Sequence, residues 1–141
     1  MSTIVVGVDG SETATQAAAT AARIATALNA DLLVVSAFPT YAVPRAEATD
    51  ADALTTREAA EQTALVVAEQ VGAAHPGLVV NYDAEPGKPG EALVQVAEAK
   101  GADLIVVGNK RVQGVARVLG NVAGDVVRKA PCDVYIAHTH G

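Results

Sequence analysis

Two glycines and two adjacent cations lie close together in the last third of the sequence. Gly108 ends an apolar, β-branched run and is soon followed by Lys110 and Arg111. A second glycine, Gly120, stands with Asn121 at the head of the last expected helix. Glycines let backbone N–H groups approach an anion closely, and a helix N-terminus adds partial positive charge. This spacing therefore predicts a site for a phosphate-bearing ligand between two glycine turns.

Each of these residues also has an ordinary structural explanation. Glycine commonly ends a strand before a loop, so Gly108 could be a strand terminator. Lys110 and Arg111 could be solvated loop charges, and Gly120 could cap the C-terminus of a helix. The combination favours a ligand site only if these residues lie at the carboxyl edge of a sheet, where open α/β folds bind ligands.

The elements needed to form that edge are indicated by the rest of the chain, in which buried strands alternate with helices. Ser11 is a good N-cap for the first helix, and Gly101 is a good C-cap for the third. The expected strands are 3–8, 32–37, 78–84, 102–107 and 133–138, and the expected helices are about 12–28, 51–71, 89–100 and 121–129. This order predicts one α/β domain over residues 1–141, a three-layer α/β/α sandwich with a five-stranded parallel sheet.

The composition narrows the classes of function. The 141 residues are 50% hydrophobic and 3% aromatic, with a formal net charge of −6. An acidic chain lacks the basic face that nucleic acids and anionic membranes require, and few aromatic side chains are available for base stacking. The single cysteine, Cys132, excludes an intrachain disulfide or a Cys-rich zinc site and is expected to be a buried small residue. No signal peptide or long apolar run is recognised, so a cytoplasmic protein is expected.

Three segments of the chain resemble the universal stress protein family. They read Ile-Val-Val-Gly-Val-Asp-Gly-Ser, Ala-Asp-Leu-Ile-Val-Val-Gly-Asn and Ala-Pro-Cys-Asp-Val-Tyr-Ile-Ala-His-Thr, and they occur in this order across essentially the whole chain. The resemblance implies a flavodoxin-like or Rossmann-like sheet with strand order 3-2-1-4-5. It also implies a homodimer formed through the last strand, Val134 to His138, whose free edge would otherwise be open to pairing.

The resemblance further implies an adenine-nucleotide site, with ATP as the first expectation and ADP, AMP or cyclic AMP as alternatives. Mg²⁺ would be bound through the phosphates. Gly7, Val8 and Asp9 would line the end of the first strand, and Ala37 would lie beside the adenine ring. The phosphates would be surrounded by Gly108, Asn109, Lys110, Arg111, Gly120, Asn121 and Val122. Asp9 would lie near the ribose or the Mg²⁺ ion, with an Asx turn into the first helix as the alternative explanation.

The loop after Gly108 departs from the binding signature of the family, which is Gly, two residues, Gly, nine residues, then Gly and Ser or Thr. Arg111 replaces the second glycine, eight residues (112 to 119) precede Gly120, and Asn121 replaces the terminal Ser or Thr. Arg111 could pair with a phosphate through a bidentate, charge-assisted contact. Alternatively, its bulk and the shorter loop could close the triphosphate site.

Three functions therefore compete. The first is a nucleotide-binding regulatory module acting in stress response. The second is a dimeric protein-interaction module that has lost nucleotide binding, as the altered loop suggests. The third, a slow ATP hydrolase, is disfavoured because the chain has no P-loop, and no catalytic residue is predicted. The pattern of His, Cys, Asp and Glu also supports no metal site independent of a nucleotide.

Overall fold

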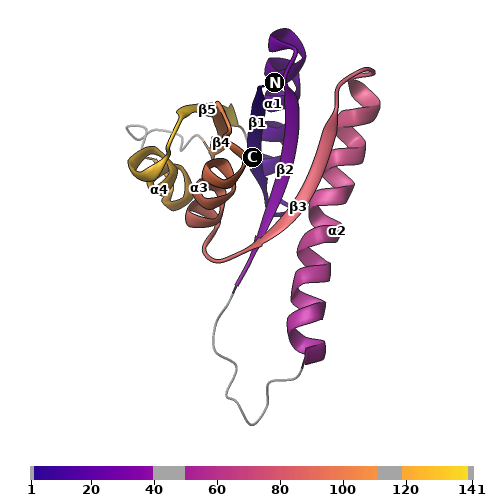
Figure 1. Cartoon of the computed structure of the whole chain (residues 1–141), viewed down its shortest axis with the longest axis vertical. Coiled ribbons are helices and arrows are strands. Elements are labelled where there is room, and N and C mark those ends of the chain that lie inside the picture. The colour runs from indigo at the N-terminus through magenta and orange to yellow at the C-terminus, as the bar shows by residue number, and fades with distance from the viewer. Residues whose placement is uncertain (1, 40–49, 111–118, 140–141) are drawn as a thin grey trace.

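The computed structural model describes residues 2–39, 50–110 and 119–139, with the side chains of residues 50–55 and of Lys110 excluded. Strands and helices alternate along the chain as the sequence pattern predicts (Figure 1). In chain order they are β1 Thr3–Val8, α1 Glu12–Leu28, β2 Asp31–Phe38, α2 Asp50–Ala74, β3 Val80–Pro86, α3 Pro89–Lys100, β4 Leu104–Lys110, α4 Asn121–Lys129 and β5 Asp133–Thr139.

The strands form one parallel sheet in the order β3-β2-β1-β4-β5, which confirms both the predicted fold class and the predicted strand order. β1 is the central strand, and its Ile4 pairs with Leu32 of β2 on one side and with Leu104 of β4 on the other. Central strands of parallel sheets are buried on both faces and therefore read as continuous apolar runs. Accordingly, Ile4, Val5 and Val6 are each no more than 1% exposed.

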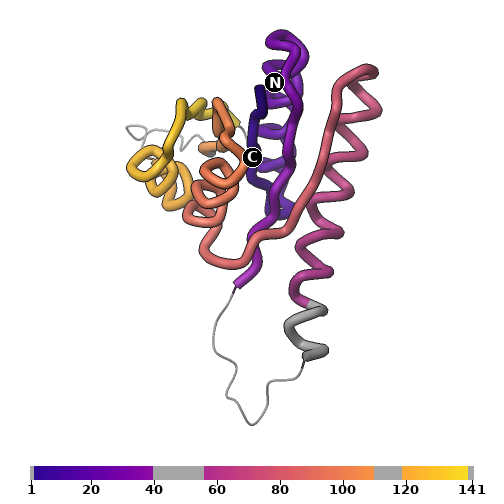
Figure 2. Tube along the Cα trace, in the orientation of Figure 1, coloured from indigo at the N-terminus to yellow at the C-terminus, as the bar shows by residue number. Residues whose placement is uncertain are grey.

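Two helices cover each face of this sheet. Alternate residues of a strand point to opposite faces, so each strand contributes side chains to both apolar cores. Ile4, Val6 and Val34 belong to the apolar core under α1 and α2, whereas Val5 and Val35 belong to the core under α3 and α4. The Cα trace in Figure 2 follows the crossing between the two layers, since the chain turns after β3 and enters α3 on the opposite face.

The first helix can pack closely on the sheet because its inner face consists of alanine. The fully buried positions are Ala17, Ala18, Ala21, Ala22 and Ala25. Ser11 is the N-cap as predicted, and its hydroxyl accepts a hydrogen bond from the Ala14 N–H at 3.1 Å. Gly101 caps the C-terminus of α3 in the left-handed conformation, with φ of 61°, also as predicted.

The prediction that the fourth strand breaks at Gly108 is wrong, because β4 continues to Lys110. The strand does not end there because β5 provides partners for each added residue, pairing Gly108 with Ala137 and Lys110 with Thr139. A Cβ atom at Gly108 would lie 3.2 Å from the Cγ2 atoms of Thr13 and Thr139. This glycine therefore lets α1 and β5 approach β4 and does not form a turn.

Other predicted boundaries differ by a few residues. β2 extends to Phe38 and α2 extends to Ala74, because ladder and helix hydrogen bonds continue past the apolar runs. β3 begins at Val80 and not at residue 78, because its ladder with β2 starts there. Cys132 is only partly buried and packs at the margin of the core under α3 and α4. Within the described ranges, none of the helices has the length and apolar character needed to cross a membrane.

Candidate functional site

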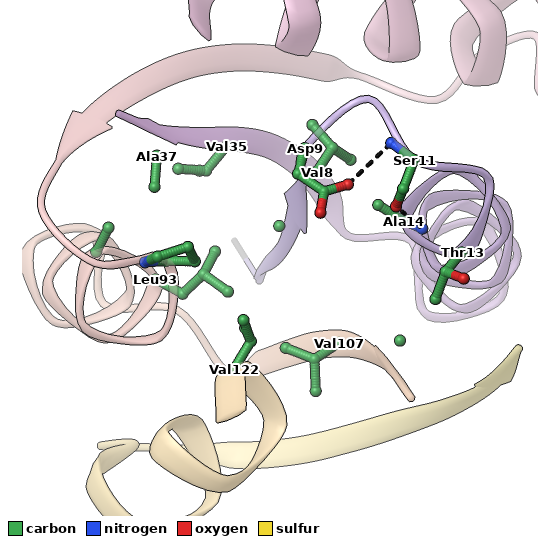
Figure 3. A pocket seen from close by; sticks show the side chains of 14 residues that line it. Val8, Asp9, Ser11, Thr13, Ala14, Val35, Ala37, Leu93, Val107 and Val122 are labelled. Carbon is green, nitrogen blue, oxygen red and sulfur yellow. Dashed lines mark hydrogen bonds between the residues drawn. The ribbon is translucent and has the colours of Figure 1, made fainter. Parts of the chain in front are cut away.

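A pocket of about 130 Å³ lies at the carboxyl edge of the sheet (Figure 3). The chain leaves β1 toward β2 on one side and leaves β4 toward β5 on the other, so the pocket lies where the strand order reverses. Open α/β sheets bind their ligands at this type of switch point. The lining residues are Gly7, Val8, Asp9, Ser11, Thr13, Ala14, Val35, Ala37, Pro89, Ala92, Leu93, Val107, Gly108 and Val122.

The pocket has chemically distinct sides. Figure 3 shows the side chains of Val35, Ala37 and Leu93 on one side, and those of Asp9, Ser11 and Thr13 on the opposite side near the start of α1. Ligand pockets typically combine a predominantly apolar lining with a few placed polar groups. This arrangement can hold a flat apolar group against β2 and α3 while polar atoms of the same ligand face α1.

Asp9 forms the turn that starts α1. Its Oδ1 atom accepts a hydrogen bond from the Ser11 N–H at 2.9 Å, which confirms the Asx turn considered from the sequence. The turn passes through Gly10, whose φ of +86° is a conformation that favours glycine. The carboxylate of Asp9 is nevertheless exposed and lines the pocket, so it remains accessible to a ligand.

Gly7 and Gly108, two glycines predicted to lie at the site, allow neighbouring elements to pack closely. A Cβ atom at Gly7 would lie 2.7 Å from Cδ1 of Leu93, so glycine allows this leucine of α3 to reach the sheet. Gly108 has the equivalent role against Thr13 of α1. Both glycines line the pocket, and their small size contributes to the space that the pocket occupies.

The structure places the remaining predicted residues in two groups. Ala37 and Val122 line the pocket with Val8, whereas Gly120 and Asn121 are exposed at the N-terminus of α4 and are not part of the lining. Gly120 is the N-cap of α4, with φ of −66° and ψ of 171°, so its explanation as a helix C-cap is wrong.

Asn109 is buried, with 7% exposure, and its Oδ1 atom accepts a hydrogen bond from the Gly120 N–H at 2.9 Å. The Gly120 N–H, which the sequence suggested as a contact for an anion, is therefore occupied by a side chain of the protein. The backbone of Lys110 ends β4, but its side chain lies outside the described part of the chain. Arg111 lies outside it entirely, so the effect of an arginine at this position stays a prediction.

The sequence prediction missed the pocket residues at the starts of α1 and α3. Ser11, Thr13 and Ala14 come from the start of α1, and Pro89, Ala92 and Leu93 come from the start of α3. A signal for these residues was present, because a helix that follows a parallel strand begins at the carboxyl edge of the sheet. Pro89 also marks a first helical turn directly after β3.

Nothing in the described ranges provides a protein-only metal site. No group of three or more His, Cys, Asp or Glu side chains is placed to hold an ion there. Asp9 is the acidic residue of the pocket lining. A single carboxylate does not fit a metal ion held by the protein alone.

The fold and the pocket define a doubly wound α/β protein with a ligand pocket at its switch point. The sequence profile of the universal stress protein family matches residues 1–138, and this chain belongs to that family. It is 36% identical over 145 residues to universal stress protein Rv1636 of Mycobacterium tuberculosis H37Rv, covering 97% of this chain and 96% of the relative.

Solved structures of the family have the same fold. A universal stress protein crystallised in complex with cAMP is 30% identical, with a TM-score of 0.73 over 98% of this chain and 97% of the other. UspA from Lactobacillus plantarum is 25% identical, with a TM-score of 0.70 and coverage of 96% of each chain. These likenesses extend over nearly the whole domain and therefore include the strands and helices that form the pocket.

Proposed function

We propose that this protein is a cytoplasmic regulatory module of the stress response that binds an adenine nucleotide in the pocket at the switch point. The observation that carries the proposal is the pairing of an apolar side from β2 and α3 with a polar side at the start of α1. The solved relative that binds cAMP, at 30% identity, supports the same assignment.

The proposed ligand lies with its purine ring against Val35, Ala37 and Leu93, where the burial of apolar surface stabilises binding. The ribose then lies near Asp9, because an exposed carboxylate at the end of a strand can accept hydrogen bonds from ribose hydroxyls. The phosphates point toward the N-terminus of α4, whose first-turn N–H groups have no acceptor within the helix. ATP is the first ligand to test, followed by ADP, AMP and cyclic AMP, and Mg²⁺ would be held through the phosphates.

Isothermal titration calorimetry with these four nucleotides, with and without Mg²⁺, tests this proposal. Ala37→Leu adds bulk inside the pocket and should weaken or abolish binding. Ala99→Leu makes the same change at an exposed position of α3 outside the pocket lining and should leave affinity within twofold of the unmodified protein. If the unmodified protein binds none of the nucleotides, or if Ala37→Leu binds as tightly as the control, the assignment of this pocket is wrong.

A third variant addresses the unusual loop. If Arg111 contacts a phosphate, Arg111→Gly should weaken ATP binding more than adenosine binding, because only ATP has charges for the guanidinium to pair with. If Arg111 obstructs the triphosphate site, the same variant should strengthen ATP binding. The ratio of the two affinities separates these cases without reference to protein stability.

We further propose that two copies associate through β5. This strand lies at the edge of the sheet, and Tyr135 and Ile136 are 47% and 36% exposed there. An edge strand with apolar side chains is a surface suited to pairing with an identical strand. Light scattering after gel filtration should give the mass of a dimer, and Ile136→Lys should shift it to the monomer. Val79→Lys, at another exposed apolar residue, is the matched control.

A further inference from the structure

The N-terminus of α4 has no cap of its own. Its N-cap residue is Gly120, which has no side chain to accept a hydrogen bond from the first turn. Instead, the Oδ1 atom of Asn109 accepts the hydrogen bond of the Gly120 N–H at 2.9 Å from a residue eleven positions earlier in the chain. The helix is therefore attached to the sheet at the residue where it begins.

Asn109 is well placed to hold that attachment in a fixed position. It lies in β4, where it pairs with His138 of β5, and its side chain is part of a residue that is only 7% exposed. The Asn109 oxygen belongs to a buried residue, whereas the Gly120 N–H belongs to an exposed one, so the hydrogen bond between them is partly buried. The oxygen that accepts the Gly120 N–H thus comes from a buried residue in a strand that is paired with β5.

The attached turn of α4 also forms part of the pocket. Val122, two residues after Gly120, lines the pocket and lies beside Val107 in Figure 3. Val107 and Asn109 are on the same face of β4, because residues two apart in a strand point to the same side. The pocket-lining Val107 is therefore the nearest residue of β4 on that face to Asn109, which bonds to α4. A shift of the α4 N-terminus would move Val122 and the first-turn N–H groups together.

We infer that Asn109 is a positioning residue for ligand binding, which holds the first turn of α4 at the pocket through the Gly120 N–H. This inference rests on the proposed binding of an adenine nucleotide. It assigns Asn109 a role through α4, in place of the direct contact with phosphates that the family resemblance implied. Loss of the side chain should therefore lower ligand affinity even if the helix itself remains folded.

A double-mutant cycle separates positioning from simple helix capping. Gly120 has a negative φ, and a Cβ atom added there would lie 3.6 Å from Oδ1 of Asn109, so serine fits at this position. Serine is a good N-cap. Gly120→Ser therefore gives α4 a cap of its own. In a chain that also carries Asn109→Ala, this cap does not restore the hydrogen bond between α4 and β4. The four proteins are the unmodified chain, Asn109→Ala, Gly120→Ser and the double variant.

The affinity for AMP and the thermal midpoint are measured for all four proteins. Asn109→Ala should lower AMP affinity about tenfold, which corresponds to about 1.4 kcal/mol, both in the otherwise unmodified chain and in the Gly120→Ser background. Asn109→Ala alone should lower the thermal midpoint, and the double variant should recover most of that loss. If the affinity recovers together with the midpoint, or if Asn109→Ala binds AMP normally, Asn109 does not position the site.

Amide hydrogen exchange without ligand gives an independent reading of the attachment. The amide of residue 120 should be protected in the unmodified chain and in Gly120→Ser, and it should exchange faster in both proteins that carry Asn109→Ala. Equal protection in all four proteins would contradict the attachment itself. If the unmodified chain binds no adenine nucleotide, the proposed function fails first. If it binds and the cycle shows no loss at Asn109, only the positioning role fails.

Discussion

Helices α3 and α4 pack closely at Gly90 of α3, and this contact predicts opposite effects for two glycine-to-alanine substitutions. A Cβ atom at Gly90 would lie 2.6 Å from Cβ of Asp125 and 3.2 Å from the carbonyl oxygen of Val122, both in α4. A Cβ atom at Gly124 of α4 would meet only Nη1 of Arg128 at 3.4 Å, the end of a side chain that is 67% exposed.

Overpacking of a tight contact costs about 1–3 kcal/mol. Replacing glycine by alanine inside a helix raises the free energy of unfolding by about 0.5–1 kcal/mol. Gly90→Ala should therefore lose up to about 2.5 kcal/mol, whereas Gly124→Ala should gain about 0.5–1 kcal/mol. Urea unfolding followed by circular dichroism measures both values, and each kcal/mol should move the thermal midpoint by about 2–4 °C in a domain of this size. A Gly90→Ala protein as stable as Gly124→Ala would refute the close approach of α3 and α4.

Three further substitutions or reactions test other parts of the structure. Ser11→Ala removes the N-cap of α1 and should cost about 1 kcal/mol in urea unfolding, whereas Ser2→Ala, at an exposed residue before β1, should cost almost nothing. The Thr139 hydroxyl is buried without a hydrogen-bond partner in the described structure, so Thr139→Val should gain about 1 kcal/mol, and a loss would indicate a partner for it. Burial, followed by the charge of Asp133, raises the pKa of the Cys132 thiol, so iodoacetamide should alkylate it more slowly at pH 8 than it alkylates glutathione. An equal rate would contradict the raised pKa.

The fold was predictable because its signals are local and mutually consistent. The continuous apolar run of β1 indicated a strand buried on both faces, and Ser11 and Gly101 marked helix ends through their own backbone and side-chain preferences. The strand order, by contrast, came from the family resemblance, because nothing local in β4 specifies that it pairs with β1.

The candidate site was predictable only in part. Gly7, Val8, Asp9 and Ala37 all line the pocket, and their place there followed from the family resemblance. The role of Gly108 did not, because its neighbour Thr13 is distant in sequence and only the folded chain brings them together. The hydrogen bond from Gly120 to Asn109 is a contact of the same kind, in which the identity of the two residues gave no sign of their pairing.

The central place of β1 has a consequence for the order in which the molecule can assemble. As the chain is synthesised, β1 can pair with β2, and β2 with β3, once residues up to Pro86 are available. Its other edge stays unpaired until β4, about a hundred residues later, is made. Contacts this distant in sequence form slowly, because a long loop must close first. Since Val107 and Gly108 of β4 line the pocket, a nascent or truncated chain that lacks β4 cannot form the complete pocket.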